Sequence, residues 1–156
     1  MFAIRVARPD DLPELAGVYA EAEGAVRAGL GGTMPRDPAG LVAWLGKRLA
    51  GAGGFWVAAL ATGRIAGFVE AGATELNAIY VLPEAWGRGV ASGLHDHAVA
   101  HMRASGLCAI TLLVMAANGR ARRFYERHGW RLAGDAGPRT VGGVEVAFVS
   151  YELALR

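Results

Sequence analysis

The stretch that decides the fold is Glu75-Leu-Asn-Ala-Ile-Tyr-Val-Leu-Pro-Glu-Ala-Trp-Gly-Arg-Gly-Val-Ala-Ser-Gly93. Its first half predicts a strand that Pro83 ends, and its glycines predict a tight turn that opens directly into a helix. No carboxylate stands between Gly87 and Ala91, and successive backbone N–H groups can point the same way. Such N–H groups at a helix N-terminus bind anions, and pyrophosphate is a common one. We therefore expect a phosphate-bearing cofactor at residues 86–93.

The composition indicates one globular domain over residues 1–156, which is long enough to bury a core. Hydrophobic residues make up 53% of the chain, yet no window approaches the roughly 20 apolar residues of a membrane span. A net charge of +2 is too small to indicate a nucleic-acid or membrane partner. The start of the chain lacks the pattern of a secretory signal, and Cys108 is the only cysteine, so we expect a cytoplasmic protein. Cys108 lies in an apolar stretch and is expected to be buried.

The rest of the chain predicts an α+β fold. Four helices are expected: one after Asp10 or Asp11, one carrying Leu41, Leu45 and Leu49, one over about 89–104, and one from Asn118 to Gly129. Strands are expected at 2–6, 55–60, 65–71, 76–82, 109–115, 131–133 and 144–153, with a loop at 29–40 and a turn-rich stretch at 134–143. These elements predict a mixed, mostly antiparallel twisted sheet of about six or seven strands, flanked by about four helices.

Three kinds of glycine turn compete for residues 86–93. A Walker loop needs a Lys-Ser/Thr pair after its glycines, and Ala91-Ser92 stands there instead. A dinucleotide fingerprint would have its third glycine one residue earlier than Gly93 and would follow the first strand of the fold. The third possibility is coenzyme A, with its pyrophosphate on the turn and its pantetheine arm along the strand at 76–82.

Two motifs resemble those of the GCN5-related N-acetyltransferases. The segment Trp86-Gly-Arg-Gly-Val-Ala91 is similar to the family's Gln/Arg-x-x-Gly-x-Gly/Ala, with Trp86 in place of the usual Gln or Arg. The segment Asn118 to Trp130 is similar to Asn-x-x-Ala-x-x-x-Tyr-x-x-x-Gly-Phe, with Ala121, Tyr125 and Gly129 in register. A helix and a strand separate the two motifs, as the family requires.

The resemblance implies acetyl-CoA as the cofactor and a set of residues that bind it. The turn and the pantetheine contacts would comprise Val81, Trp86, Gly87, Arg88, Gly89, Val90, Ala91, Ser92 and Asn118. A backbone N–H near Val81 or Leu82 would stabilise the carbonyl oxygen. Arg120 or Arg122 could reach the adenosine 3′-phosphate, because guanidinium groups suit phosphate geometry.

Two residues are the catalytic candidates. Tyr125 stands where family members donate a hydrogen bond or proton to the departing sulfur, and a phenol can do this chemistry. Glu75, at the start of the predicted strand, is the preferred general base over Glu70 and Glu84. No metal is expected: His97 and His101 have a chelating spacing, but position 98 is Ala where the zincin motif has Glu.

The acceptor is expected between the loops at 29–40 and 134–143. Met34, Arg36, Asp135, Arg139 and Glu145 are the candidates for contacting it. The sequence thus predicts an acetyltransferase that moves an acetyl group from acetyl-CoA to a primary amine by direct attack. The amine could be a small molecule, a peptide N-terminus or a lysine, and a homodimer is possible. An acyl-CoA sensor without turnover, a different acyl group and a hydroxyl acceptor are the alternatives.

Overall fold

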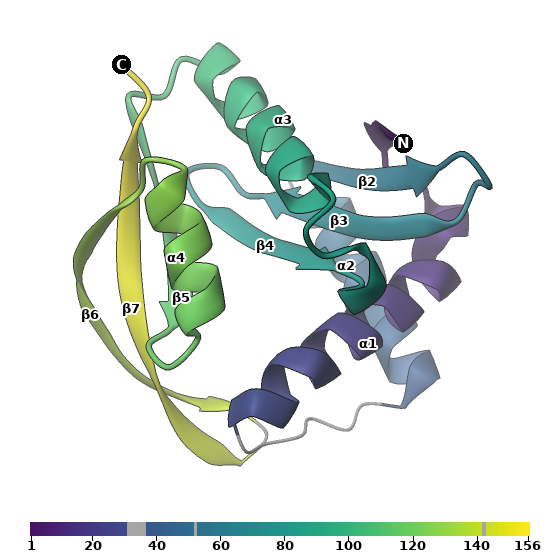
Figure 1. The fold of residues 1–156 in the computed structure, drawn as a ribbon, viewed down its shortest axis with the longest axis horizontal. Helices are drawn as coiled ribbons and strands as arrows, with labels where there is room; N and C mark the ends of the chain where they lie inside the picture. Colours follow the sequence, from purple (N-terminus) through teal and green to yellow (C-terminus); the bar gives the residue numbers. More distant parts are fainter. Residues whose placement is uncertain (31–36, 52, 142) are drawn as a thin grey trace.

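The computed structural model describes residues 1–30, 37–51, 53–141 and 143–156. In this part of the chain there are four α-helices: α1 (Leu12–Leu30), α2 (Pro38–Gly51), α3 (Val90–Ala104) and α4 (Gly119–Arg127). The seven strands are β1 (Phe2–Val6), β2 (Gly54–Leu60), β3 (Ile65–Ala71), β4 (Leu76–Val81), β5 (Ala109–Met115), β6 (Arg131–Val141) and β7 (Val144–Ala154). The α+β fold and its element order are therefore confirmed (Figure 1).

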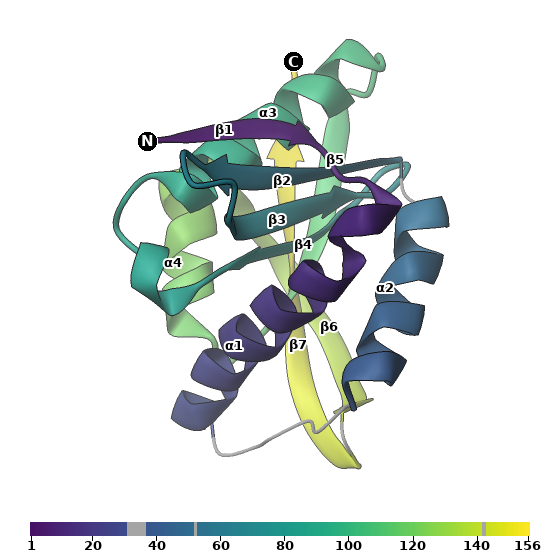
Figure 2. The same ribbon diagram turned by 90° about the vertical axis from the view of Figure 1, so that its right-hand side faces the viewer.

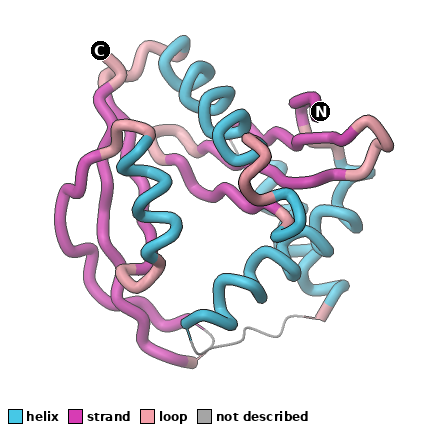
Figure 3. The backbone as a smooth tube through the Cα atoms, viewed as in Figure 1, coloured by secondary structure: helices cyan, strands magenta, loops and turns pink. Residues whose placement is uncertain are grey.

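The strands form two antiparallel sheets (Figure 3). One sheet has the order β1-β2-β3-β4 and the other the order β5-β7-β6. Among the described residues, the link between the sheets is a parallel bridge of Glu75 with Thr111, beside which the Thr111 N–H donates to the Thr74 carbonyl at 3.2 Å. Past this bridge β4 and β5 diverge, so that the expected mixed sheet is split along this line (Figure 1).

Helices cover both faces of the four-stranded sheet (Figure 2). On one face, α3 packs through Val90, Leu94 and Met102, in a core that also includes Trp56 and Trp130. On the other face, α1 and α2 pack through a second group, which includes Leu15, Tyr19, Leu41, Leu45 and Phe68. Because both faces are covered, β3 is buried along its whole length.

The structure corrects the prediction for residues 134–143. The glycines in this stretch indicated turns, but β6 continues to Val141 and pairs with β7 along this length. The pairing register shifts between Leu132 and Gly134 and again between Asp135 and Gly137. The glycines therefore mark β-bulges inside a long hairpin rather than a loop.

The structure also corrects the prediction for Cys108, which is exposed rather than buried. The residue precedes β5, and its carbonyl accepts a hydrogen bond from the Leu155 N–H at 2.8 Å. The apolar run that begins at Leu107 is buried only at alternate positions, Ile110, Leu112 and Val114. A continuous apolar run therefore did not mean continuous burial here, because successive side chains of β5 point to opposite faces of its sheet and only one face is buried.

The close approach of β3 to β4 requires glycine at position 67. A methyl group at this position would lie 2.7 Å from the Tyr80 carbonyl oxygen and 3.2 Å from the Val81 Cα. Both contacts are with backbone atoms, so relief would require β4 itself to move. We expect Gly67→Ala to lower the free energy of unfolding by about 1–3 kcal/mol, as overpacked sites do, measured by urea denaturation.

Gly17→Ala is the matched control for this substitution. Gly17 is exposed within α1, and a methyl group there would meet no atom within 4 Å. Alanine is the better helix former, so this variant should gain about 0.5–1 kcal/mol. Equal effects of the two variants would contradict the role assigned to Gly67.

Candidate active site

The divergence of β4 from β5 opens a cavity of about 660 Å³. Residues Asn77 to Val81 line it from β4, and Leu113 to Met115 line it from β5. The turn before α3 and the first residues of α3 close one end, whereas side chains of α1, α2 and β3 close the other. Helix α4 adds a further wall, so the cavity is bordered by both sheets and all four helices.

The turn before α3 presents backbone N–H groups to this cavity. Gly87 and Gly89 have φ angles of +76° and +81°, a conformation that other L-residues rarely adopt. Gly89 is the N-cap of α3 and no side chain caps this helix end. The first helical bond is from the Gly93 N–H to the Gly89 carbonyl, which leaves the N–H groups of Val90, Ala91 and Ser92 without helical partners. A Cβ on either glycine would enter open space, so the turn has room for an anionic group.

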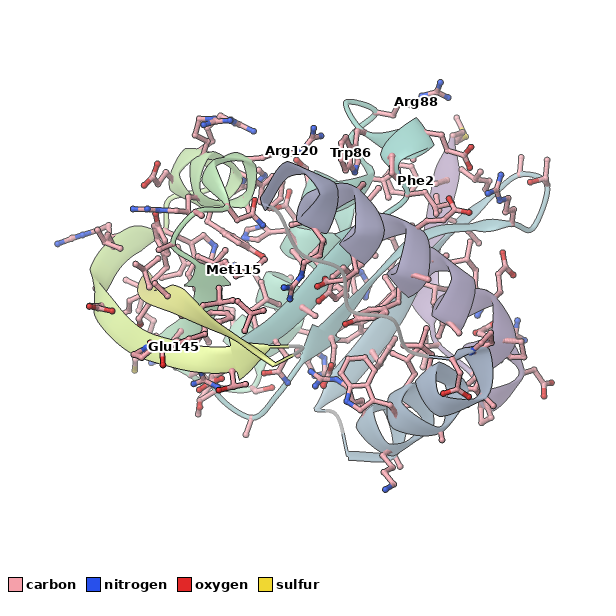
Figure 4. The ribbon with its side chains drawn as sticks, turned by 90° about the horizontal axis from the view of Figure 1, so that it is seen from below. Phe2, Trp86, Arg88, Met115, Arg120 and Glu145 are labelled. Carbon is pink, nitrogen blue, oxygen red and sulfur yellow. The ribbon has the colours of Figure 1, made fainter. Side chains whose placement is uncertain are left out.

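An arginine from α4 lies across this turn. The Arg120 guanidinium carbon is 3.6 Å from the ring centroid of Trp86, a cation–π contact that joins the two rims of the cavity (Figure 4). The Trp86 indole N–H also donates to the Val81 carbonyl at 3.0 Å, which fixes the ring. Position 86 thus holds an aromatic platform for a cation supplied by another helix. Sequence reasoning considered Arg120 but had no signal for this contact.

The other two arginines expected to bind phosphate, Arg88 and Arg122, do not line the cavity. Arg88 does not line the cavity and borders a second hollow with Phe2 and Arg64 (Figure 4). Arg122 donates to the Tyr151 hydroxyl at 3.0 Å and to the Ala116 carbonyl at 2.9 Å, which ties α4 to β7 and to the end of β5. Of these arginines, only Arg120 lines the cavity that contains the glycine turn.

The backbone of β4 also presents N–H groups to the gap between the sheets. Leu82 donates its N–H to the Ala66 carbonyl at 2.8 Å, so this group belongs to the ladder with β3. Neighbouring residues of a strand point their N–H groups to opposite sides, and the Val81 N–H therefore faces away from β3. Of the two candidate N–H groups, that of Val81 is therefore the one directed toward the gap.

Tyr125 and Asn118 both line the cavity from α4 and the residue before it. The Asn118 Oδ1 accepts a hydrogen bond from the Ala121 N–H at 3.2 Å, which confirms the expected helix cap. Burial raises the pKa of Tyr125 to about 12, so its phenol is protonated at neutral pH. Its ring lies against Trp130 and Phe124, with centroids 5.8 and 5.4 Å away.

Glu75 lies apart from these groups. It is exposed, it does not line the cavity, and it stands at the bridge where β4 and β5 are still joined. Val81 is at the opposite end of β4, six residues and about 20 Å along the strand. The position of Glu75 therefore gives no support to its expected role as the general base.

Two carboxylates that sequence reasoning ranked lower or missed do line the cavity. Glu70 is 5% exposed, and its two oxygens accept from Arg48 Nε at 2.6 Å and from Asn77 Nδ2 at 3.1 Å. Glu23 is 9% exposed, and its Oε1 accepts from Arg27 Nε at 2.7 Å. Nothing in a helical sequence marks Glu23 as a cavity residue, because its burial depends on how α1 packs on the sheet.

Aromatic rings surround these two ion pairs. Tyr19 contacts Trp44 at 5.1 Å and Tyr80 at 4.9 Å between centroids, and all three rings line the cavity. Burial raises the pKa of Tyr80 well above its ordinary value, and the nearby charge of Glu23 adds to this effect. Tyr125 and Tyr19 contribute in the same direction, and all three tyrosines line the cavity.

The predicted acceptor contacts on the β6–β7 hairpin do not line the cavity. Asp135, Arg139 and Glu145 do not line it, and the Asp135 carboxylate accepts instead from the Gly137 N–H at 2.8 Å. Glu145 stands on the β6–β7 hairpin, away from Trp86 and Arg120 (Figure 4). Met34 and Arg36 fall outside the described residues.

The histidines behind the glycine turn form a hydrogen-bonded cluster. His95 is buried, and its Nε2 accepts from the Trp130 indole at 2.8 Å while its Nδ1 contacts Asp96 at 2.9 Å. His128 contacts the Phe124 carbonyl and the Ser92 hydroxyl at 2.7 and 3.0 Å. These atoms could in principle hold a cation, but every ring nitrogen already has a protein partner. His97 and His101 are exposed and pack edge-on against Trp56.

The comparisons with known proteins agree with this architecture. Residues 14–130 match the sequence profile of the Acetyltransferase (GNAT) family. This match spans well over half of the chain, which therefore belongs to that family. None of the curated proteins matches the chain significantly.

Solved structures share the fold at low sequence identity. A GCN5-related N-acetyltransferase from Rhodopseudomonas palustris is 20% identical with a TM-score of 0.82, over 99% of this chain and 96% of that one. A phosphinothricin acetyltransferase from Sinorhizobium meliloti in complex with acetyl-CoA is 19% identical with a TM-score of 0.77, over 98% and 88%. The PaiA N-acetyltransferase from Thermoplasma acidophilum in complex with coenzyme A is 19% identical with a TM-score of 0.71, over 99% of each chain.

The buried imidazole of His95 predicts a pH dependence of stability. Burial lowers the pKa of His95, so in the folded protein it resists protonation more than in the unfolded chain. The contribution of the neutral His95 imidazole to the free energy of unfolding is therefore complete above the unfolded-state pKa of about 6.5. It is lost as the pH falls from there through the lower folded-state pKa. We expect a slope of up to about 1.4 kcal/mol per pH unit in unfolding free energy as the pH falls below about 6.5.

Urea denaturation across this pH range checks the expectation, with His95→Gln as the comparison. Glutamine keeps an acceptor for the Trp130 indole but does not titrate. An unchanged slope in His95→Gln would assign the effect to other groups.

Proposed function

We propose that this protein transfers an acetyl group from acetyl-CoA to a primary amine by direct attack. The observation that carries the proposal is one cavity that contains the glycine turn, the end of β4 and Tyr125. Family membership supports the reaction class. Beyond this reaction class, the proposal specifies a primary amine as the acceptor and assigns roles to individual residues.

The lining of the cavity fits coenzyme A. The turn residues Trp86, Gly87, Gly89, Val90, Ala91 and Ser92 would hold the pyrophosphate through backbone N–H groups, with Arg120 beside them. Val81 and Asn118 would border the pantetheine arm between the diverging strands. Acetyl-CoA supplies an acetyl group activated by its bond to a thiol. That two similar folds are complexes with coenzyme A or acetyl-CoA supports this assignment.

Two groups of the chain would act on the acetyl carbonyl and the thiol. The Val81 N–H is a backbone donor held in place by the pairing of β3 with β4, and a preorganised donor of this kind would stabilise the negative charge that develops on the carbonyl oxygen. Tyr125 would donate its phenolic hydrogen toward the sulfur. With a pKa of about 12, this phenol is a weaker acid than most thiols, so it suits a strong hydrogen bond better than a complete proton transfer.

Glu23 is the carboxylate that we assign to the amine. A primary ammonium group loses its proton at a cost of about 4 kcal/mol at neutral pH, so a nearby acceptor assists the reaction. The Glu23 Oε1 is bound to Arg27, whereas its Oε2 accepts no hydrogen bond from another described residue. Glu23 and Tyr125 line the same cavity, which supports placing the amine and the departing thiol within it together.

Assembly and location are lesser parts of the proposal. β6 forms an edge of its sheet and carries the exposed Leu132, which supports pairing with a second copy in a homodimer. No described helix is both long and apolar enough to cross a membrane. A cytoplasmic location stays a prediction.

Calorimetric titration with acetyl-CoA tests the cofactor. Binding is expected for the wild-type protein and not for NADPH or ATP at the same concentrations. Gly89→Glu should abolish binding, because the side chain would enter the open space at the turn and repel phosphate. Gly63→Glu is the control: its φ of +88° carries the same backbone strain, but it lies in the β2–β3 turn outside the cavity.

Tyr125→Phe tests the catalytic role. The substitution removes one hydroxyl, so we expect kcat to fall by about 10²- to 10⁴-fold with little change in the dissociation constant for acetyl-CoA. Thiol release with an amine acceptor gives kcat, and calorimetry gives the affinity. Unchanged turnover would remove Tyr125 from the mechanism, and acetyl-CoA binding without turnover by any amine would indicate a sensor.

A further inference from the structure

The end of the cavity that faces α1 and α2 is a zwitterionic site. It holds two carboxylates and two guanidinium groups, arranged as the pairs Glu23–Arg27 and Glu70–Arg48. Three of these four side chains are more than nine-tenths buried as residues, with Glu23, Arg27 and Glu70 exposed by 9%, 8% and 5%. The charges balance, so a ligand that carries a net charge would find no net countercharge here.

Hydrogen-bonding capacity remains on both signs of charge. Arg27 uses Nε for its bond to Glu23, and no other described residue accepts from its terminal nitrogens. The free Glu23 Oε2 belongs to the same helical pair, separated by one turn of α1. A carboxylate and a guanidinium fork are thus presented side by side, each with capacity for one more partner of opposite charge.

We propose that the acceptor is a small α-amino acid, with its amine at Glu23 and its carboxylate at Arg27. This inference rests on the proposed acetyl transfer and names the substrate class of the same site. An ammonium and a carboxylate on one carbon match the two adjacent side chains in sign and order. A diamine would place a second positive charge beside Arg27 or Arg48, and a simple amine would leave the guanidinium without a new partner.

The walls of the site indicate the side chain of that amino acid. Tyr19, Trp44 and Tyr80 form a contiguous aromatic surface next to the ion pairs. Phe68 and Phe148 also line the cavity and add apolar surface to it. An apolar or aromatic side chain would bury its surface there, whereas a charged one would lose hydration without a partner.

Matched acceptors test this proposal. The twenty common L-amino acids are assayed by thiol release from acetyl-CoA, and the best is compared with its decarboxylated amine and its α-carboxamide. We expect kcat/KM for the amino acid to exceed both by at least about tenfold, as a charge-assisted pair should give. Equal or better turnover of the decarboxylated amine, or turnover of peptides alone, would overturn the proposal.

Arg27→Gln separates recognition from folding. It should raise KM for the amino acid and reduce the preference over the decarboxylated amine to about onefold, while the affinity for acetyl-CoA stays unchanged. Arg64→Gln removes an exposed arginine paired with Glu84 outside this cavity and should change neither quantity. Calorimetric binding of acetyl-CoA separates the proposed acetyl transfer from the amino-acid acceptor. If acetyl-CoA does not bind, the acetyl transfer itself is contradicted. If acetyl-CoA binds and other amines are acetylated but no amino acid is, only the amino-acid acceptor is contradicted.

A second inference comes from the hydrogen bond between Ser92 and His128. The Phe124 carbonyl can only accept, so the His128 Nδ1 at 2.7 Å must carry the hydrogen. In the neutral ring, Nε2 then accepts from the Ser92 hydroxyl at 3.0 Å. Ser92 lines the cavity within the first turn of α3, yet its hydrogen points away toward the imidazole.

We infer that an anion bound at the glycine turn draws a proton from solvent onto the His128 Nε2. The protonated ring donates to the Ser92 oxygen, and the Ser92 hydroxyl is then free to donate to the anion. One proton is taken up, and one hydrogen bond reverses. The groups that face this imidazole are His95 and Asp96 from α3, and Glu126 and Arg127 flank it on α4. His128 acts through Ser92 and is therefore a positioning residue.

Calorimetry with coenzyme A at pH 7 tests the proton uptake. Titrations in Tris and in HEPES, which differ in their heat of ionisation, give the number of protons bound. A net uptake is expected for the wild type and should vanish in His128→Gln, whose amide can donate to Ser92 without a proton from solvent. Equal uptake in both proteins would overturn the inference, whereas failure of coenzyme A to bind would contradict the cofactor assignment instead.

Discussion

The whole site depends on where two strands stop pairing. β4 and β5 are joined through Glu75 and Thr111, and beyond that bridge each strand keeps only its outer neighbour. An interrupted ladder leaves backbone N–H and carbonyl groups without strand partners, which is costly unless something else binds them. The Val81 carbonyl is bound by the Trp86 indole, and its N–H faces the gap. The cavity is therefore the space that the sheet leaves for a ligand that can replace a strand.

Much of this architecture could be predicted from sequence because it is local. The glycines at 87 and 89 predict the turn, because glycine readily adopts positive φ angles. The helix cap at Asn118 is predicted because asparagine is common at helix N-termini. Except for β6, the bounds predicted for the strands agree with the structure to within a few residues. The two motifs also identified the family, and this identification is confirmed.

The rest depends on tertiary contacts that no spacing records. Glu75 was favoured because it begins a strand, but the bridge to Thr111 keeps it at the closed end. No sequence pattern singled out Glu23 and Arg27, and both are buried and line the cavity because of how α1 packs on the sheet. The glycines at 134 and 137 indicated turns, because a bulge and a turn use the same residue for the same backbone freedom. In each case the position of the residue in the folded chain depends on long-range contacts, which local sequence patterns do not predict.

The contact between Trp86 and Arg120 has a consequence for how this sequence could change. The two residues come from opposite rims of the cavity and are 34 positions apart in the chain, yet their cation–π contact holds both side chains in position. A polar side chain at 86 would reach a bound anion by itself and would leave a guanidinium at 120 without its platform. Substitutions at positions 86 and 120 are therefore expected to be coupled, with the polar or charged side chain at the anion site supplied either by the turn or by α4. Substitutions at these sites should appear in pairs among relatives, although neither site is a neighbour of the other in sequence.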